Sequence, residues 1–176
     1  MKLFKHLQLL LLMLPLLVSC NQHTTKEKVP SETHVSKDNN ITKIISTDID
    51  TLGKILDFSN HKPIRVEFRY TLIDNSGKND RLSVSGPSDS SLEAVLYFDK
   101  KTFRAIEDFE LNLEWIEQHH SKEEFNFEWL PEDVRRELEQ HNVANYKGHP
   151  DVFFETGVHG KAWYLDHKIL LKADNN

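Results

Sequence analysis

The chain has 176 residues, of which 22 are Lys or Arg and 28 are Asp or Glu, so its formal charge is −6. This acidic balance argues against nucleic acid as a partner, because phosphates need a basic surface. A single cysteine allows no disulfide within the chain, so the fold must be held by its hydrophobic core.

The N-terminal segment has the layout of an export signal. Lys2 and Lys5 precede an apolar run from Leu9 to Val18, which is too short for a membrane-spanning helix of about 20 residues. The run ends in Leu16-Leu17-Val18-Ser19-Cys20, which resembles the lipobox of bacterial lipoproteins. The resemblance implies that residues 1–19 are removed and that Cys20 becomes the first residue and carries acyl chains.

The resemblance also implies a location. Residues 1–19 hold two lysines and no acidic residue, so 20 basic and 28 acidic side chains remain, a formal charge of −8. An acidic domain has no electrostatic attraction to anionic lipid headgroups, which leaves the acyl chains on Cys20 to hold the membrane. Asn21 follows the cysteine where Asp would favour the inner membrane. The implied location is therefore the cell envelope, at the periplasmic side of the outer membrane.

The stretch after the cysteine is polar. Asn21 to about Asn40 contains almost no apolar side chains, and such a segment buries too little surface to offset the entropy of ordering. We therefore predict a lipidated cysteine with a flexible tether over residues 20–45, followed by a single globular domain over residues 46–176.

The first half of the domain alternates between helix and strand patterns. Apolar spacing predicts a short helix from Asp48 to Phe58 with Asp48 as its cap. Strict alternation predicts a half-buried strand over 65–72, with a second short strand near 81–85. Residues 86–91 have the composition of a loop, and the apolar run 94–98 predicts a central strand covered on both faces.

Helices are predicted next. Asp99 can cap a helix that ends near Glu110, with Phe103, Ile106 and Phe109 facing the core. Residues 111–127 fit helix or strand equally. Pro131 is suited to the first position of a further helix.

The sequence of the C-terminal quarter predicts strands. We predict strands over 152–156 and 161–165 joined by a hairpin loop at 157–160, and a tight turn at Asp166-His167 before a last strand over 168–171. The sum is an α+β fold: an antiparallel sheet of about five strands with two or three helices packed on one face.

One cluster has residue types that bind metal. If residues 117–124 are helical, His119 with Glu123 and His120 with Glu124 lie one turn apart, where imidazole and carboxylate can share a zinc ion. Zinc normally takes three or four protein ligands, and an exposed helix surface explains the same residues without metal.

Phe125, Phe127 and Trp129 alternate with polar residues just before Pro131. Two interpretations are open: an exposed edge strand that pairs with a partner chain, or core packing. The sequence nominates no catalytic residues and no cofactor.

These features favour a membrane-anchored protein-interaction module with a protein partner in the envelope; lipoproteins of this plan include accessory and immunity proteins. Two alternatives stay open. One is a solute- or metal-binding lipoprotein that uses the C-terminal histidines, and the other is an envelope hydrolase. The interaction module predicts an exposed apolar patch, and the metal-binding lipoprotein predicts three converging histidines. The hydrolase predicts a deep pocket with titratable groups.

Overall fold

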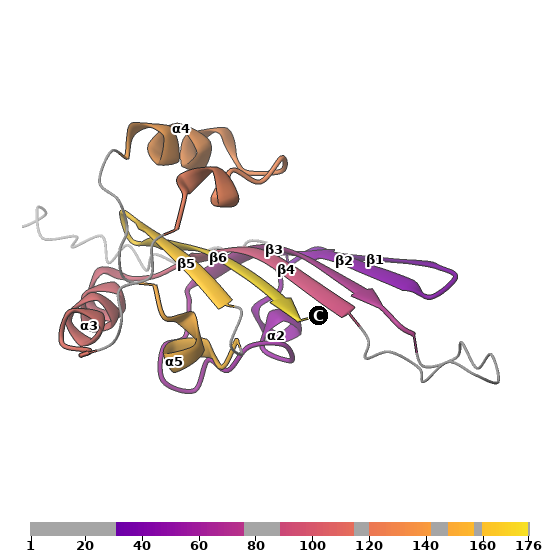
Figure 1. Ribbon diagram of the computed structural model, residues 1–176, viewed down its shortest axis with the longest axis horizontal. Helices are drawn as coiled ribbons and strands as arrows, with labels where there is room; N and C mark the ends of the chain where they lie inside the picture. Colours follow the sequence, from indigo (N-terminus) through magenta and orange to yellow (C-terminus); the bar gives the residue numbers. More distant parts are fainter. Residues whose placement is uncertain (1–30, 76–88, 115–119, 142–147, 157–159, 176) are drawn as a thin grey trace, which may run out of the picture. The chain divides into compact units, whose positions relative to one another are not determined.

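The computed structural model describes residues 31–75, 89–114, 120–141, 148–156 and 160–175 (Figure 1). These residues form an antiparallel sheet of six strands in the order β1-β2-β3-β4-β6-β5. The strands are β1 (Thr33–Asp38), β2 (Ile41–Ser46), β3 (Arg65–Ile73), β4 (Asp89–Tyr97), β5 (Gly160–Leu165) and β6 (Lys168–Asn175).

Helices lie on both faces of this sheet (Figure 1). Helices α2 (Ile49–Leu52), α3 (Lys100–Leu111) and α5 (Pro150–Phe154) lie on one face, and the 3-10 helix η1 (Lys122–Phe125) and α4 (Glu132–Gln140) on the other. The predicted α+β fold with an antiparallel sheet is confirmed, with six strands instead of about five. The expectation that the helices share one face is wrong, because the sheet is apolar on both faces.

Each face has its own hydrophobic core, and β4 contributes to both. Ala94 and Leu96 of β4 belong to the cluster under α2, α3 and α5, whereas Val95 between them belongs to the cluster under η1 and α4. All three are fully buried, as the period of two in a strand requires when both faces are covered. The prediction of a central, doubly covered strand is confirmed.

The predicted alternation in β3 is also confirmed. Val66 and Phe68 are buried in the core under α2, while Arg65 and Arg69 are exposed. The short strand predicted near 81–85 lies outside the described residues. Besides β2, β3 pairs with β4, which takes in residues 89–91 that we expected to be loop.

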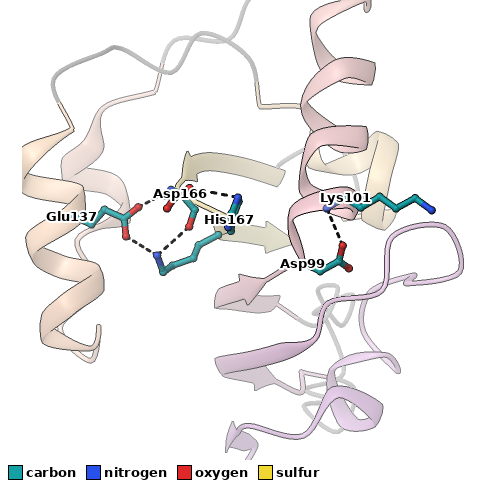
Figure 2. Close-up of polar contacts among 6 residues, drawn as sticks. Asp99, Lys101, Glu137, Asp166 and His167 are labelled. Atoms are coloured by element: carbon teal, nitrogen blue, oxygen red, sulfur yellow. Dashed lines mark hydrogen bonds and ion pairs between the residues drawn. The ribbon is translucent and has the colours of Figure 1, made fainter. Parts of the chain in front are cut away.

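Helix α3 begins as predicted. The Asp99 carboxylate accepts a hydrogen bond from the Lys101 backbone N–H at 2.9 Å (Figure 2) and another from the Thr102 N–H at 3.0 Å. These bonds satisfy N–H groups that have no partner inside the helix, and they hold the pKa of Asp99 below its usual value. Phe103 and Ile106 are buried.

The end of α3 differs from the prediction. The third inward residue is Glu110, which is 4% exposed, whereas Phe109 is 51% exposed. From Ile106, the helix period allows either residue to follow at a spacing of three or four. The hydrogen bonds that Glu110 makes inside the domain, described below, account for its inward position.

The first predicted helix is shorter than expected. Asp48 caps it through a hydrogen bond from the Thr51 N–H at 2.9 Å, but α2 ends at Leu52 and the chain turns at Gly53. Pro131 stands directly before α4 instead of at its first position, and Val134 and Leu138 form the buried side of this helix.

The predicted tether and the predicted strand over 152–156 need correction. Residues 33–46 form the β1–β2 hairpin, so strand structure begins within the segment 20–45 that we expected to be flexible. The hairpin gains its order from backbone pairing with β3, which a compositional argument does not register. Residues 152–156 lie mostly in α5, where Pro150 stands at the helix start and both Phe153 and Phe154 are buried.

The β5–β6 turn links the two helical layers (Figure 2). The predicted tight turn is present, and its second residue, His167, has a left-handed conformation with φ at 55°. Glu137 of α4 accepts from the Asp166 N–H at 2.6 Å and from the Lys168 ammonium at 2.7 Å. On the other side, the His167 carbonyl accepts from the Phe98 N–H at 3.0 Å, directly before α3. The hairpin loop predicted at 157–160 lies largely outside the described residues.

Candidate functional site

The described residues of the predicted metal site, His120, Glu123 and Glu124, have separate surroundings. His119 lies outside the described residues, as does Cys20, the predicted lipidation site. The Glu124 carboxylate accepts from the Lys161 ammonium, which lowers the pKa of Glu124, and Glu123 accepts from the Ser121 hydroxyl. In the part of the chain that is described, no three His, Cys, Asp or Glu side chains are grouped to hold a metal ion.

His120 is packed against aromatic rings instead. Its ring meets that of Phe125 edge-on at 6.1 Å, and Phe125 lies 5.8 Å from Trp163. The His120 Nε2, the Trp163 Nε1 and the His141 Nδ1 are buried without a hydrogen-bond partner. Burial lowers the pKa of His120, since its charged form would lose solvation.

The aromatic triplet belongs mainly to the core. Phe125 is fully buried and Phe127 is 4% exposed, both in the cluster under η1 and α4. Trp129 is half-buried, and its indole N–H donates to the Glu93 carboxylate at 2.6 Å, while the Arg69 guanidinium lies 5.6 Å from its ring centre. Of the two interpretations, core packing therefore holds for Phe125 and Phe127, and the triplet is not an exposed strand.

A buried polar cluster that the sequence did not reveal joins α3 to the segment before α5. Glu110 accepts from the His149 backbone N–H at 3.2 Å and contacts its Nδ1 at 2.8 Å. The Tyr164 hydroxyl of β5 donates to the second carboxylate oxygen at 3.1 Å. Burial, with the nearby Glu110 charge, raises the pKa of Tyr164 well above its usual value. The His149 and Glu110 side chains are buried, with exposures of 5% and 4%.

This cluster holds the chain against one edge of the sheet. In the strand order, β5 and β1 are the two outermost strands. Gly148 lies so close to the Ala162 backbone in the middle of β5 that an added Cβ would be 2.7 Å from the Ala162 carbonyl oxygen. The segment around Gly148 and His149 therefore covers the outer side of β5.

The opposite edge is open. All six residues of β1 are exposed, and its one strand neighbour in the described chain is β2. In Figure 1, no helix of the described chain lies over the β1–β2 end of the sheet. An exposed edge strand is a template for pairing with another strand, and proteins usually blunt it with a cover, a bulge or a proline.

Both faces of the hairpin carry an exposed aliphatic side chain. Val35 pairs with Ile44, which in turn pairs with Tyr70 of β3 on the face of α2, and the exposure of Val35 is 56%. Ile45 pairs with His34 and Arg69 on the opposite face, and its exposure is 48%. The remaining exposed large apolar residues of the described chain are Ile64, Phe109 and Leu111.

The backbone of β1 also offers hydrogen-bonding groups. Asn39 and Asn40 form a two-residue turn that is closed by the pair Asp38–Ile41, with φ of Asn39 at 52°. In such a hairpin the closing pair is hydrogen-bonded, and the two kinds of pair then alternate. Thr33, Val35 and Lys37 therefore point their N–H and C=O groups away from β2, toward a further strand.

Comparisons with known proteins leave this geometry as the main guide to function. The chain matches no family model, and no curated protein or solved structure is found to be similar. Within the described residues there is no helix with the length and apolarity needed to cross a membrane.

Proposed function

We propose that this protein is an envelope lipoprotein, anchored by acyl chains on Cys20, that acts by binding another protein chain through the open edge of β1. The support for the anchor is the sequence Leu16-Leu17-Val18-Ser19-Cys20 after a short apolar run. The support for the binding mode is the contrast between the two sheet edges: β5 is covered by the Gly148 segment, whereas β1 is exposed along its length.

The open edge is the observation that carries the proposal. An extended segment that pairs with β1 gains main-chain hydrogen bonds from Thr33, Val35 and Lys37. Its side chains meet Val35 on one face and His34, which lies beside Ile45, on the other. Strand addition of this kind gives affinity through the backbone and specificity through alternating side chains. It suits a binding, inhibitory or accessory role and needs no catalytic group.

The anchor is tested on the full-length protein in its own cells. We expect the wild type in the membrane fraction and a Cys20→Ala variant in the soluble fraction, because a single acylated residue supplies the attachment. Wild-type protein that is soluble, or Cys20→Ala protein that stays in the membrane, would contradict the anchor.

The binding edge is tested by chemical crosslinking and mass spectrometry with two variants of one residue. Val35→Pro removes an outward N–H without removing a bond to β2, and proline is tolerated at that kind of edge position. Val35→Thr keeps the N–H and the β-branched shape. We expect one stoichiometric crosslinked chain with the wild type and with Val35→Thr, and its loss with Val35→Pro. Equal crosslinking in all three would rule out the β1 edge.

A further inference from the structure

The shape and charge of β1 point to one occupant of the open edge. We infer that β1 pairs with β1 of a second copy of this chain, antiparallel, around a twofold axis that passes through Ser36. This inference rests on the proposed function, because it takes the open edge as the binding surface and the membrane as the place of assembly.

Symmetry leaves few registers for such a pair. A twofold axis perpendicular to the sheet keeps every side chain on its own face, so each residue must pair with one an even number of positions away. Near the middle of β1, the axis can pass through Val35 or through Ser36. These two registers place different charges opposite each other.

Charge favours the axis through Ser36. With the axis through Val35, Glu32 of each copy would face Asp38 of the other, and like charges directly opposite are destabilising. With the axis through Ser36, His34 of each copy faces Asp38 of the other, where an imidazole N–H can donate to the carboxylate. This favourable contact occurs twice.

The same register covers exposed apolar surface. Val35, which is 56% exposed, then faces Lys37 of the second copy, whose aliphatic stem can lie over the valine with its ammonium in water. On the opposite face, the His34–Asp38 pair lies beside Ile45 of the first copy and Ile41 of the second, since these residues pair with His34 and Asp38 in the hairpin.

The small size of this contact makes the membrane important. Pairing of two six-residue strands buries less than the roughly 1,000 Å² that a stable interface needs in solution. Two anchored copies in one membrane meet at a much higher effective concentration, so a weak pairing is populated there.

A cysteine at the axis tests the register in the full-length, lipidated protein. In the inferred register, Ser36 faces itself in a non-hydrogen-bonded pair, with Cα atoms about 4.5 Å apart, which suits a disulfide. Val35 would lie diagonally from Val35 of the second copy, beyond the roughly 7 Å reach of a disulfide. After mild oxidation of membranes, we therefore expect disulfide-linked dimers from Ser36→Cys and few from Val35→Cys.

Charge variants in the Ser36→Cys background test the contact itself. Adding Asp38→Lys replaces each carboxylate acceptor by an ammonium, which cannot accept from the His34 N–H, and we expect dimer formation to fall roughly three- to tenfold. Adding His34→Asp together with Asp38→Lys places a carboxylate opposite each ammonium and should restore the dimer. If the charges have no effect, the His34–Asp38 contact is not made.

The remaining outcomes separate this inference from the proposed function. More dimer from Val35→Cys than from Ser36→Cys would overturn the inferred register. No dimer from either, with the crosslinked partner of the wild type being a different chain, would overturn the second-copy inference and leave the open edge as a binding surface. A disulfide dimer of the wild type would show a free Cys20 thiol and contradict the anchor.

Discussion

At the scale of single residues, Gly148 lies close against the backbone of β5. A Cβ at this position would meet the Ala162 carbonyl oxygen at 2.7 Å, whereas at Gly53 the nearest atom would be 3.3 Å away. Gly53 has ordinary helical angles, so alanine is allowed there.

We expect Gly148→Ala to lower the free energy of unfolding by about 1–3 kcal/mol, because the backbone of β5 must shift to accept the methyl group. Gly53→Ala is the matched control and should stay within about 1 kcal/mol of the wild type. Urea denaturation of both variants measures the difference. Equal stability of the two would mean that Gly148 does not lie against β5.

A second prediction at this scale concerns acid. Burial is the main cause that lowers the pKa of His120 below its usual value. Nearby Lys161 and His149 lower this pKa further, whereas Glu124 and the Gly148 backbone oppose the shift. Below about pH 6.5 the His120 side chain of the unfolded protein therefore binds a proton more readily than that of the folded protein. The free energy of unfolding then falls as the pH drops through the folded-state pKa of His120.

We expect the urea midpoint to fall between about pH 7.5 and pH 5.5, and to fall less in a His120→Gln variant. His61, whose pKa is also lowered by burial, contributes to the fall in both proteins and so leaves the difference between them unchanged. A fall of the same size in wild type and variant would show that His120 is not protected from protons in the folded state.

At the scale of elements, helix α3 is joined to the segment before α5 and to β5 by one buried carboxylate. Glu110 accepts from His149 and from Tyr164, at 2.8–3.2 Å. Replacing it by alanine removes the acceptor for these bonds and leaves buried donors that have lost an anionic partner, so the cost is expected to exceed that of an ordinary surface change.

We expect Glu110→Ala to destabilise the domain by roughly 3 kcal/mol. Glu107→Ala on the exposed side of the same helix is the control and should change stability by less than about 0.5 kcal/mol. Thermal or urea unfolding measures both. If Glu110→Ala were no worse than Glu107→Ala, the buried cluster would contribute nothing to the attachment of the segment before α5.

At the scale of the whole molecule, non-covalent contacts hold the fold without a disulfide. It contains one cysteine, which we propose is acylated, so no disulfide is available to support the sheet. Two cores, one on each face, take that role, with β4 and β6 contributing to both.

We therefore expect the thermal midpoint of the full-length protein to be the same with and without reductant, and non-reducing gels to show a monomer. The measurement also bears on the anchor, because an acylated Cys20 has no thiol to oxidise. A Cys20→Ala variant provides the reference. Any effect of reductant on the wild type that is absent from Cys20→Ala would indicate a free thiol.

The sequence by itself determined features that depend on neighbouring residues. The alternation in residues 65–72, the continuous apolar run at 94–98 and the capping residues Asp48 and Asp99 follow from local geometry and local hydrogen bonds, and the structure confirms each of them. The fold class followed from their sum.

Only the tertiary structure decided the features that depend on distant partners. Residues 33–46 form strands because β2 pairs with β3. Glu110 is buried because His149 and Tyr164, which are distant in sequence, form hydrogen bonds with it. Phe125 belongs to the core because Trp163 lies beside it. The open edge of β1 belongs to this group, since an edge exists only once the strand order is known. Composition cannot encode such pairings, because their energy is gained between segments that are adjacent in space and remote along the chain.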